Sequence, residues 1–320
     1  MRFLPRLFAL LAAATLCSAA AAQFPSRPVT ILVPIAAGGA PDIAARVLAA
    51  KLAEALGQPV VVENRTGANG NIAGELLARA APDGHTLGLL ADSQVAINPH
   101  LYKNMPFDTL RDLTPVHLVA GNQFVLTVNP KLPVKTFAEF IEFARRSQPP
   151  LAYASGGNGS QHHLTMEMLK QRAGIDMLHV PFKGGTPAAA AAVAGDVAAV
   201  WSGSSNAAQI RAGRLRAIAV SGAKRSALYP ELPTIAEFYP GFETTIWLGL
   251  FGPAGMPPAT LARLREEIRK VLELPDTKAK LNAAGGLNPL LGTPEEFSAL
   301  IHRDYEKYAK VVKDLNLKLD

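Results

Sequence analysis

A glycine turn between a strand and a helix is the first place where residue types in this chain suggest chemistry. The stretch VTILVPIAAGGAPDIAARVLAAKL, Val29–Leu52, has an apolar strand pattern, then Gly38-Gly39, then a helix pattern. Glycine lets a backbone approach a ligand closely, and the free N–H groups of a helix start attract anions. We predict that the turn holds a nucleotide phosphate in an enzyme or the carboxylate of a carried molecule. A tight connection without a ligand is the alternative.

Two further turns are equally rich in small and hydrogen-bonding residues. The segment YASGGNGSQHHL places Ser155–Ser160 just before a helix pattern, and the segment PFKGGTP adds Lys183. Such turns offer backbone donors, a hydroxyl and an amide to a ligand. Two such loops from two domains would grip a small carboxylate from both sides. A solvent-facing Lys183 is the alternative for the third turn.

Strands and helices must position these turns, and the two patterns alternate through nearly the whole chain. Strands are expected at Val29–Ile35, Pro59–Asn64, Thr86–Ala91, Phe124–Pro130, Leu151–Ser155, Met177–Phe182, Val197–Ser202, Leu215–Ser221 and Thr244–Gly252. Helices are expected at Pro41–Leu56, Asn69–Ala80, Phe137–Arg146, Gln161–Ala173, Pro187–Ala194, from Ser205, at Pro257–Leu274 and from Thr293. This alternation favours parallel α/β sheets covered on both faces. Ligands bind such sheets at the carboxyl ends of the strands.

Two helix starts carry a specific capping signal. Thr136 precedes Glu139 by three residues, and Thr293 precedes Glu296 by the same spacing, with Pro294 between them. In this arrangement each side chain satisfies a backbone N–H of the first turn. We therefore expect helices to begin directly after both threonines.

The sequence contains none of the catalytic or metal-binding motifs that its turns invite. The loop AAGGAPD is not G-x-G-x-x-G and has no G-K-[ST], and neither G-x-S-x-G nor H-E-x-x-H occurs. His162 and His163 are adjacent, so on a helix they point about 100° apart and do not form one ligand face. We expect no metal, no cofactor and no catalytic residue. One of these histidines is expected to be packed or solvated and the other to lie near the binding cleft.

The first residues are predicted to form a cleaved secretory signal peptide. Arg2 and Arg6 precede the apolar run Leu7–Leu16, and alanines lead up to Gln23. This pattern predicts cleavage after Ala22. Lipid attachment at Cys17 is the alternative, although Leu16 stands where a small residue is usual. Because Cys17 is the only cysteine, the mature chain would contain no disulfide and no thiolate site.

The distribution of basic residues argues against a nucleic-acid partner. The formal net charge is +6, but the basic residues are spread out, with no run longer than Arg145-Arg146. Nucleic-acid binding normally needs a concentrated basic patch, so no nucleic acid is expected. With 320 residues, 49% of them hydrophobic, the chain can build one large or two medium domains.

These motifs together resemble the Bug-type periplasmic solute-binding receptors of tripartite tricarboxylate transporters. The resemblance begins with PSRPVTILVPIAAGGAPD and continues through VVENRTGANG, AINPHLYKNMPFD, GNGSQHHL, VPFKGG, WLGLFGPAGMP and GTPEEF. It covers essentially all of the mature chain. It implies an α/β fold of the two-domain periplasmic-binding-protein-like kind (type II), with crossing strands and a ligand cleft between the domains.

The expected domain limits follow from two strand patterns. FVLTVNP and LRAIAVS bracket the middle of the chain and are expected to act as a hinge pair. We therefore assign residues 1–22 to the signal peptide, 121–221 to domain 2, and 23–120 with 222–320 to domain 1.

The resemblance also implies which positions bind the ligand, largely through backbone N–H groups and waters. The positions that match the family motifs are Gly38, Gly39 and Asp42 in the first loop, Ser155, Asn158, Gly159 and His163 in the second, and Lys183 and Gly184 in the third. Their neighbours Ala40, Ser93, Ser160 and Ser202 complete the expected set together with Asp92. The chain departs from the family at Ala40-Pro41, where Gly-Thr is usual, and in the segment AVWSGSSN.

Asp92 prompts a hypothesis about ligand charge. It follows the strand TLGLLA, where family members usually have a small neutral residue. A carboxylate facing the cleft would repel a polycarboxylate, so the ligand would be less anionic than citrate. The alternative is that Asp92 or Ser93 caps the next helical turn and never meets the ligand.

The functional prediction is a periplasmic, non-enzymatic receptor. It would capture a small organic acid by hinge closure and deliver it, as a monomer, to the membrane permease of a tripartite tricarboxylate transporter. The alternatives are a secreted α/β enzyme acting on a carboxylate, which would need a nucleophile–base pair, and a ligand sensor for a membrane signalling partner.

Overall fold

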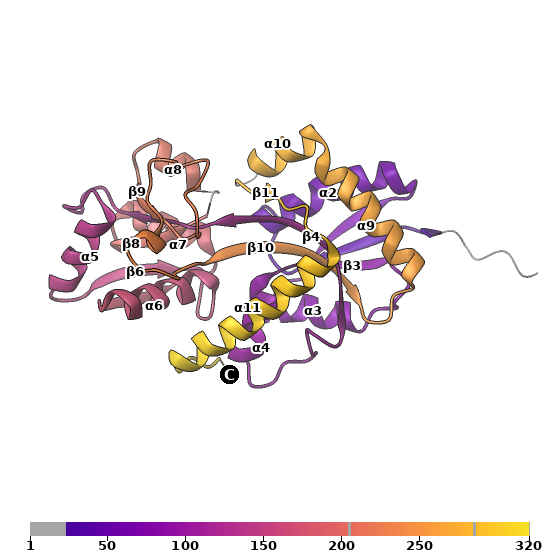
Figure 1. Ribbon diagram of the computed structural model, residues 1–320, viewed down its shortest axis with the longest axis horizontal. Helices are drawn as coiled ribbons and strands as arrows, with labels where there is room; N and C mark the ends of the chain where they lie inside the picture. Colours follow the sequence, from indigo (N-terminus) through magenta and orange to yellow (C-terminus); the bar gives the residue numbers. More distant parts are fainter. Residues whose placement is uncertain (1–23, 204–205, 284–285, 320) are drawn as a thin grey trace, which may run out of the picture.

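Two β-sheets covered by helices lie at opposite ends of an elongated molecule in the computed structural model (Figure 1). The structure describes residues 24–203, 206–283 and 286–319, so the predicted signal peptide lies outside the described residues. The first sheet has the strand order β11-β4-β10-β3-β1-β2, and the second has the order β7-β6-β8-β5-β9.

The strands and helices have the following bounds. The first sheet contains β1 (Val29–Val33), β2 (Val60–Asn64), β3 (Thr86–Ala91), β4 (Leu113–Gln123), β10 (Thr245–Pro253) and β11 (Asn288–Pro289). The second contains β5 (Val125–Val128), β6 (Leu151–Ser155), β7 (Met177–Pro181), β8 (Ala199–Ser202) and β9 (Arg216–Val220). The helices are α2 (Ala40–Leu56), α3 (Asn71–Ala78), α4 (Asn98–Leu101), α5 (Phe137–Arg146), α6 (Gln161–Ala173), α7 (Gly185–Ala194), α8 (Ala207–Arg211), α9 (Pro258–Glu273), α10 (Pro275–Ala283) and α11 (Pro294–Asp314). Three short helical turns complete the set: η1 (Ala68–Gly70), η2 (Ser93–Ile97) and η4 (Ile235–Glu237).

Both sheets are mixed, so the expectation of parallel sheets was wrong in part. β1 is parallel to β2 and β3, and β6 is parallel to β7 and β8. β10, however, is antiparallel to β3 and β4, and β5 is antiparallel to β8 and β9. The antiparallel strands are those through which the chain passes from one sheet to the other.

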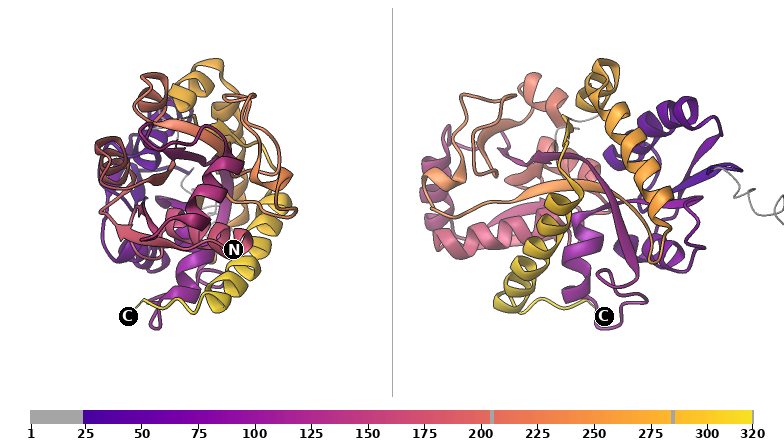
Figure 2. Two further views of the ribbon diagram at one scale, coloured as in Figure 1. Left: turned by 90° about the vertical axis from the view of Figure 1, so that its left-hand side faces the viewer. Right: turned by 45° about the vertical axis from the view of Figure 1, so that its right-hand side comes forward.

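Two connections join the sheets. β4 leads into β5 with only Phe124 between them, and the chain returns from β9 to β10 through residues 221–244. β4 and β10 pair along their length, from Leu113 opposite Pro253 to Gln123 opposite Thr245. Both run between the two units in Figure 1 and in the right-hand view of Figure 2. The helix α11 packs on η2 and β4 and reaches the start of α6.

Each unit has its own buried core. Aliphatic side chains of β1, β3, α2 and α9 form the core of the first, including Ile31, Leu48 and Ile268. The second core adds several large aromatic side chains to its aliphatic ones, including Phe124, Tyr153 and Trp201. Separate cores on separate sheets are what a two-domain fold requires.

The capping signals were correct, but several elements were not expected, including the short strand β11. Thr136–Glu139 and Thr293–Glu296 form capping boxes at the starts of α5 and α11. No strand was expected at β4, where Pro115 and His117 interrupt the apolar pattern. Neither α10 nor the π-helical turn η2 with α4 was expected either. Among the described residues, no helix is both long and apolar enough to cross a membrane.

Candidate functional site

The candidate loops follow strands whose ends face the other sheet. β3 ends at Ala91, on the edge of the first sheet where β4 ends at Gln123. β6 and β8 end on the edge of the second sheet where β5 begins, with Ser202 paired to Val125. Because Phe124 alone separates β4 from β5, these two edges adjoin. The loops after β1, β3, β6 and β7 therefore lie at the ends of their sheets that are nearer to this boundary.

The first loop, residues 34–39, is held by the side chain of Asp42. This carboxylate accepts hydrogen bonds from Gly38 N at 2.9 Å, from Asn64 Nδ2 at 2.8 Å and from the guanidinium of Arg46. Asn64 Nδ2 also donates to Ile35 O at 3.0 Å. Burial alone would raise the pKa of Asp42, but the bonds from Arg46, Gly38 and Asn64 hold this pKa below its ordinary value. Asp42 therefore fixes the loop from within.

The backbone of this loop presents donors at the start of α2. The first backbone bond of the helix runs from Ile43 N to Gly39 O at 3.0 Å. The N–H groups of Gly39, Ala40 and Asp42 come before this bond along the chain. No helix carbonyl lies one turn earlier to accept hydrogen bonds from them. Gly38 has φ +87°, and a Cβ added there would meet nothing within 4 Å. Three amide donors beside open space form an anion-binding arrangement.

Gly39 was expected to let the backbone approach a ligand, but the structure packs it against a side chain. A Cβ added at Gly39 would run into the side chain of Ile35. A larger residue there would first displace Ile35, so Gly38 is the glycine of this pair that borders open space.

The second loop, residues 155–160, is held by its own side chains. Ser155 is fully buried, and its Oγ accepts from Gly157 N at 3.1 Å. Gly159 N donates to His163 Nδ1 at 3.2 Å, and Ser160 Oγ accepts from His163 N at 3.3 Å. Ser155, Ser160 and His163 therefore shape the loop, while Asn158 at its tip is exposed.

A stack of three rings supports this loop from behind. The His163 and His179 rings lie 3.9 Å apart and almost parallel, and Tyr153 stacks on His179 at 5.0 Å. His179 Nε2 lies 2.6 Å from Ser155 Oγ. Burial, followed by the neighbouring His163, lowers the pKa of His179 to about 4, so the ring is neutral at pH 7. Sequence reasoning could not place His179 beside this loop, because it lies on another strand.

Neither adjacent histidine belongs to a metal cluster. Burial lowers the pKa of His162 to about 4, and its ring packs 4.7 Å from that of Phe124. No group of three or more metal-ligating side chains occurs in the part of the chain that the structure describes.

The third loop joins the second through its backbone. Gly184 N donates to Gly156 O at 3.2 Å. Gly184 has φ +112° with open space beside its Cα, and it precedes α7, whose first turn presents further N–H groups. Lys183 is exposed beside it. The second and third loops thus offer donors from one continuous surface.

Ser202 and Asp92 were expected to face the ligand, but the structure turns both side chains elsewhere. Ser202 is fully buried, with its Oγ 2.8 Å from that of Thr127 inside the second sheet. Asp92 is 1% exposed and accepts a hydrogen bond from Gln161. Asp92 makes no side-chain capping bond to η2. Its neighbour Ser93 is half-buried.

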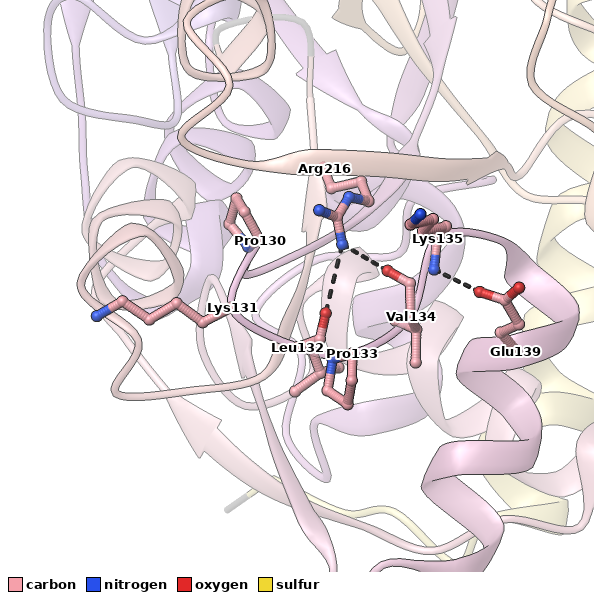
Figure 3. Close-up of a pocket in the computed structure, with 8 residues that line it drawn as sticks. All are labelled: Pro130, Lys131, Leu132, Pro133, Val134, Lys135, Glu139 and Arg216. Atoms are coloured by element: carbon pink, nitrogen blue, oxygen red, sulfur yellow. Dashed lines mark hydrogen bonds between the residues drawn. The ribbon is translucent and has the colours of Figure 1, made fainter.

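A hollow of about 520 Å³ lies away from these loops, between β9 and the start of α5 (Figure 3). Arg216 points across it and donates to the carbonyl oxygens of Leu132 and Val134. These bonds hold the turn before α5, so Arg216 has a structural task there.

Ser155 and His179 form a hydroxyl–imidazole pair of the kind an enzyme would use. The Ser155 hydroxyl, however, has no exposed surface and is bonded to Gly157 N and to His179. A nucleophile must reach its substrate within hydrogen-bond distance, and this hydroxyl is enclosed by its own loop. The pair is a structural contact.

Comparison with known proteins gives consistent matches over nearly the whole chain. The family model described as tripartite tricarboxylate transporter family receptor matches residues 44–317. Protein BugT of Bordetella pertussis is 36% identical over 301 residues, which cover 92% of this chain and 91% of BugT.

Solved structures with bound carboxylates are also similar. The structure of Rpa4515 of R. palustris with adipate has a TM-score of 0.83 and 34% identity, and it covers 91% of this chain and 97% of its own. MatC from Rhodopseudomonas palustris with bound malate has a TM-score of 0.80 and 31% identity, covering 90% and 100%. The two-domain fold is that of periplasmic binding proteins.

Proposed function

Because the chain belongs to the tripartite tricarboxylate transporter receptor family, we propose that it captures a small organic carboxylate between its two domains and delivers it to a membrane transporter of that type. The family is a receptor family of periplasmic binding proteins and not an enzyme family. We further propose that the chain is exported by a signal peptide cleaved after Ala22, works as a monomer and transforms no substrate.

The observation that supports the proposal is that backbone donors lie at strand ends on the adjoining edges of both sheets. The start of α2 contributes N–H groups from the first sheet, and the second loop with the start of α7 contributes them from the second. Gly38 and Gly184 both border open space there. Donors at helix starts bind anions through their hydrogens and through the helix dipole. Donors from both sides suit a carboxylate that is enclosed when the domains close.

We assign the hinge to the two connections between the sheets. Domain 2 would then comprise about residues 121–221, which include every strand of the second sheet. Closure would turn this unit about the β4–β5 and β9–β10 connections and bring the donors of both units to one ligand.

The proposed contacts are with the backbone N–H groups of Gly39, Ala40, Asp42 and Asn158 and with the side chain of Lys183. Gly38, Gly159 and Gly184 donate their own N–H groups within the protein and would only border the ligand. Asp42, Ser155, Ser160 and His163 would position these groups from behind. Asp92 is enclosed in this structure, so its charge does not restrict the ligand directly and citrate belongs among the candidates.

A thermal-shift screen tests this function. Mono-, di- and tricarboxylic acids, including adipate, malate and citrate, would each be compared with the corresponding amide. A ligand that binds only the folded state at 100 times its Kd stabilises that state by about 2.7 kcal/mol. At least one acid should raise the melting temperature while its amide does not, and the acid should be recovered unchanged. Equal shifts with acid and amide, no shift with any acid, or chemical conversion of the acid would contradict the proposal.

A further inference from the structure

Gln161 links the two domains at a point next to the second loop. It is the first residue of α6 and is 5% exposed. Its amide nitrogen donates to the Asp92 carboxylate, to Thr245 O at 2.8 Å and to Tyr308 Oη at 3.3 Å. Asp92 follows β3, Thr245 begins β10 and Tyr308 lies on α11. One side chain of the second domain thus contacts three separate elements outside it, an arrangement that we call the Gln161 junction.

The surroundings of this junction are buried and contain several charged groups. Asp92 and Tyr308 are each 1% exposed. On α11, the buried Asp304 accepts from Trp247 Nε1 at 2.7 Å, and nearer the surface Lys307 donates to Glu243 O at 2.7 Å. A bond made in such surroundings is costly to lose, because each partner left behind is cut off from water.

An apolar contact surrounds the junction. Ile97 and Leu101 from η2 and α4 pack with Leu164 of α6 and with Tyr308 and Val312 of α11.

The second loop takes part in the same contact. A Cβ added at Gly159 would meet Leu101 and Leu319 at 2.6 Å, so the loop lies directly against the first domain here. Leu319 is held in place by its backbone bond to Leu101 O at 2.8 Å. The second loop is therefore anchored where it meets the first domain.

We propose that Gln161 is a positioning residue for ligand capture, because it fixes the second loop to the end of β3 and to α11 and so sets the spacing between the donor groups of the two domains. This inference rests on the proposed function. Gln161 would touch no ligand. Its three bonds would hold the second domain on the first at one point, the pivot, while that domain turns about the two hinge connections, since they lie beside the crossing strands and not at the free ends of the domains.

Two variants remove hydrogen bonds of the Gln161 junction, and two control variants leave the bonds of Gln161 in place. Gln161→Met keeps side-chain length but has no N–H group to donate, and Asp92→Leu removes one acceptor. Asp92→Asn keeps an acceptor oxygen for Gln161 at nearly constant shape. Thr165→Val removes a different buried bond of α6, from Thr165 Oγ1 to Thr244 Oγ1 at 3.3 Å, which also reaches the segment before β10 but does not involve Gln161.

The experiment measures the distance between the two domains in the ligand-free protein. The chain from Gln23 onward has no cysteine, so Ala50→Cys on α2 and Gln171→Cys on α6, both exposed positions, can carry spin labels. The distance distribution should broaden in Gln161→Met and Asp92→Leu, and should keep its wild-type width in Asp92→Asn and Thr165→Val. The affinity of Gln161→Met for the best acid of the thermal-shift screen should fall by about 10-fold, while that of Thr165→Val should not change.

The outcomes separate the two proposals. If wild type binds no carboxylate, the proposed function fails, and the ligand-free distances still decide whether Gln161 is a pivot. If Gln161→Met lowers only the melting temperature, with distances and affinity unchanged, Gln161 is merely structural and the inference is overturned. Equal broadening in Thr165→Val would overturn it as well.

Discussion

At the scale of single residues, the polar side chains of the loops mostly bond to backbone atoms of the same loops. Asp42 accepts from Gly38 N, Ser155 from Gly157 N and His163 from Gly159 N. The sequence identified these residues because their types and positions match binding turns. It could not show which way each side chain points, since that depends on partners such as Asn64 and His179 on other strands.

Asp42→Asn tests how much the first loop depends on its carboxylate. An amide has one acceptor oxygen, and its NH2 group would confront donors such as Gly38 N and Asn64 Nδ2. We expect the free energy of unfolding to fall by about 1–3 kcal/mol and carboxylate affinity to fall as well. Urea unfolding and calorimetry measure the two effects. Unchanged values for both would mean that the loop is held by other contacts.

Asp92→Asn should change how stability depends on pH. Burial, with the charge of Asp304, raises the pKa of Asp92 well above its ordinary value of 3.8. A raised folded-state pKa gives stability that is complete below the unfolded-state pKa and is lost as pH rises through the folded-state pKa. The variant should therefore gain stability relative to wild type as pH rises above about 4, by about 1.4 kcal/mol per unit of pKa shift. Denaturant unfolding at pH 4.5, 6 and 7.5 measures this gain, and parallel curves would contradict it.

His179→Gln should act in the opposite pH direction. The folded-state pKa of His179 is lowered to about 4 from 6.5, so its stabilisation is present above pH 6.5 and is lost as pH falls through 4. Glutamine can place an amide nitrogen near Ser155 Oγ but does not titrate. The wild type should lose more stability than the variant between pH 7 and pH 5, by less than about 1.4 kcal/mol per pH unit, because the ring is only partly buried. Identical pH slopes would show that this ring does not titrate in that range.

At the scale of elements, the sequence predicted the starts of helices well but did not predict how the strands pair. The capping boxes at Thr136 and Thr293 located the starts of α5 and α11. The direction of β10 and β5 was not predictable, because strand pairing depends on residues far apart in the chain. β4 was not expected because its sequence shows no clear alternation of apolar and polar residues. Its pairing with β10 and β11, which are distant in the chain, stabilises it.

The role of the start of α2 in ligand binding can be tested by comparing the glycine before this helix with the glycine after it. Gly38 (φ +87°) and Gly57 (φ +69°) flank this helix, and a Cβ added at either would meet nothing within 4 Å. Alanine should cost about 1 kcal/mol of stability at both positions, because both are left-handed. Calorimetry should show weaker carboxylate binding for Gly38→Ala alone. Equal affinity in the two variants would remove the start of α2 from the site.

At the scale of the whole molecule, the sequence predicted two α/β units because its motifs resemble those of a family. The relation between the units could not be read from the sequence. It depends on contacts such as Gln161 with Asp92 and Tyr308, which are separated by 69 and 147 residues along the chain. The same contacts enclose Asp92, which the sequence suggested would face the ligand.

The central claim is that one carboxylate is gripped by backbone N–H groups from both domains at once. Amide hydrogen exchange, with and without the acid that gives the largest thermal shift, measures those groups directly. The account predicts that the ligand slows exchange together at residues 37–42 in the first domain and at residues 156–162 and 184–188 in the second, and leaves exchange at residues 131–135 beside the outer hollow unchanged. Slowed exchange in the loops of one domain only, or at the outer hollow, would contradict it.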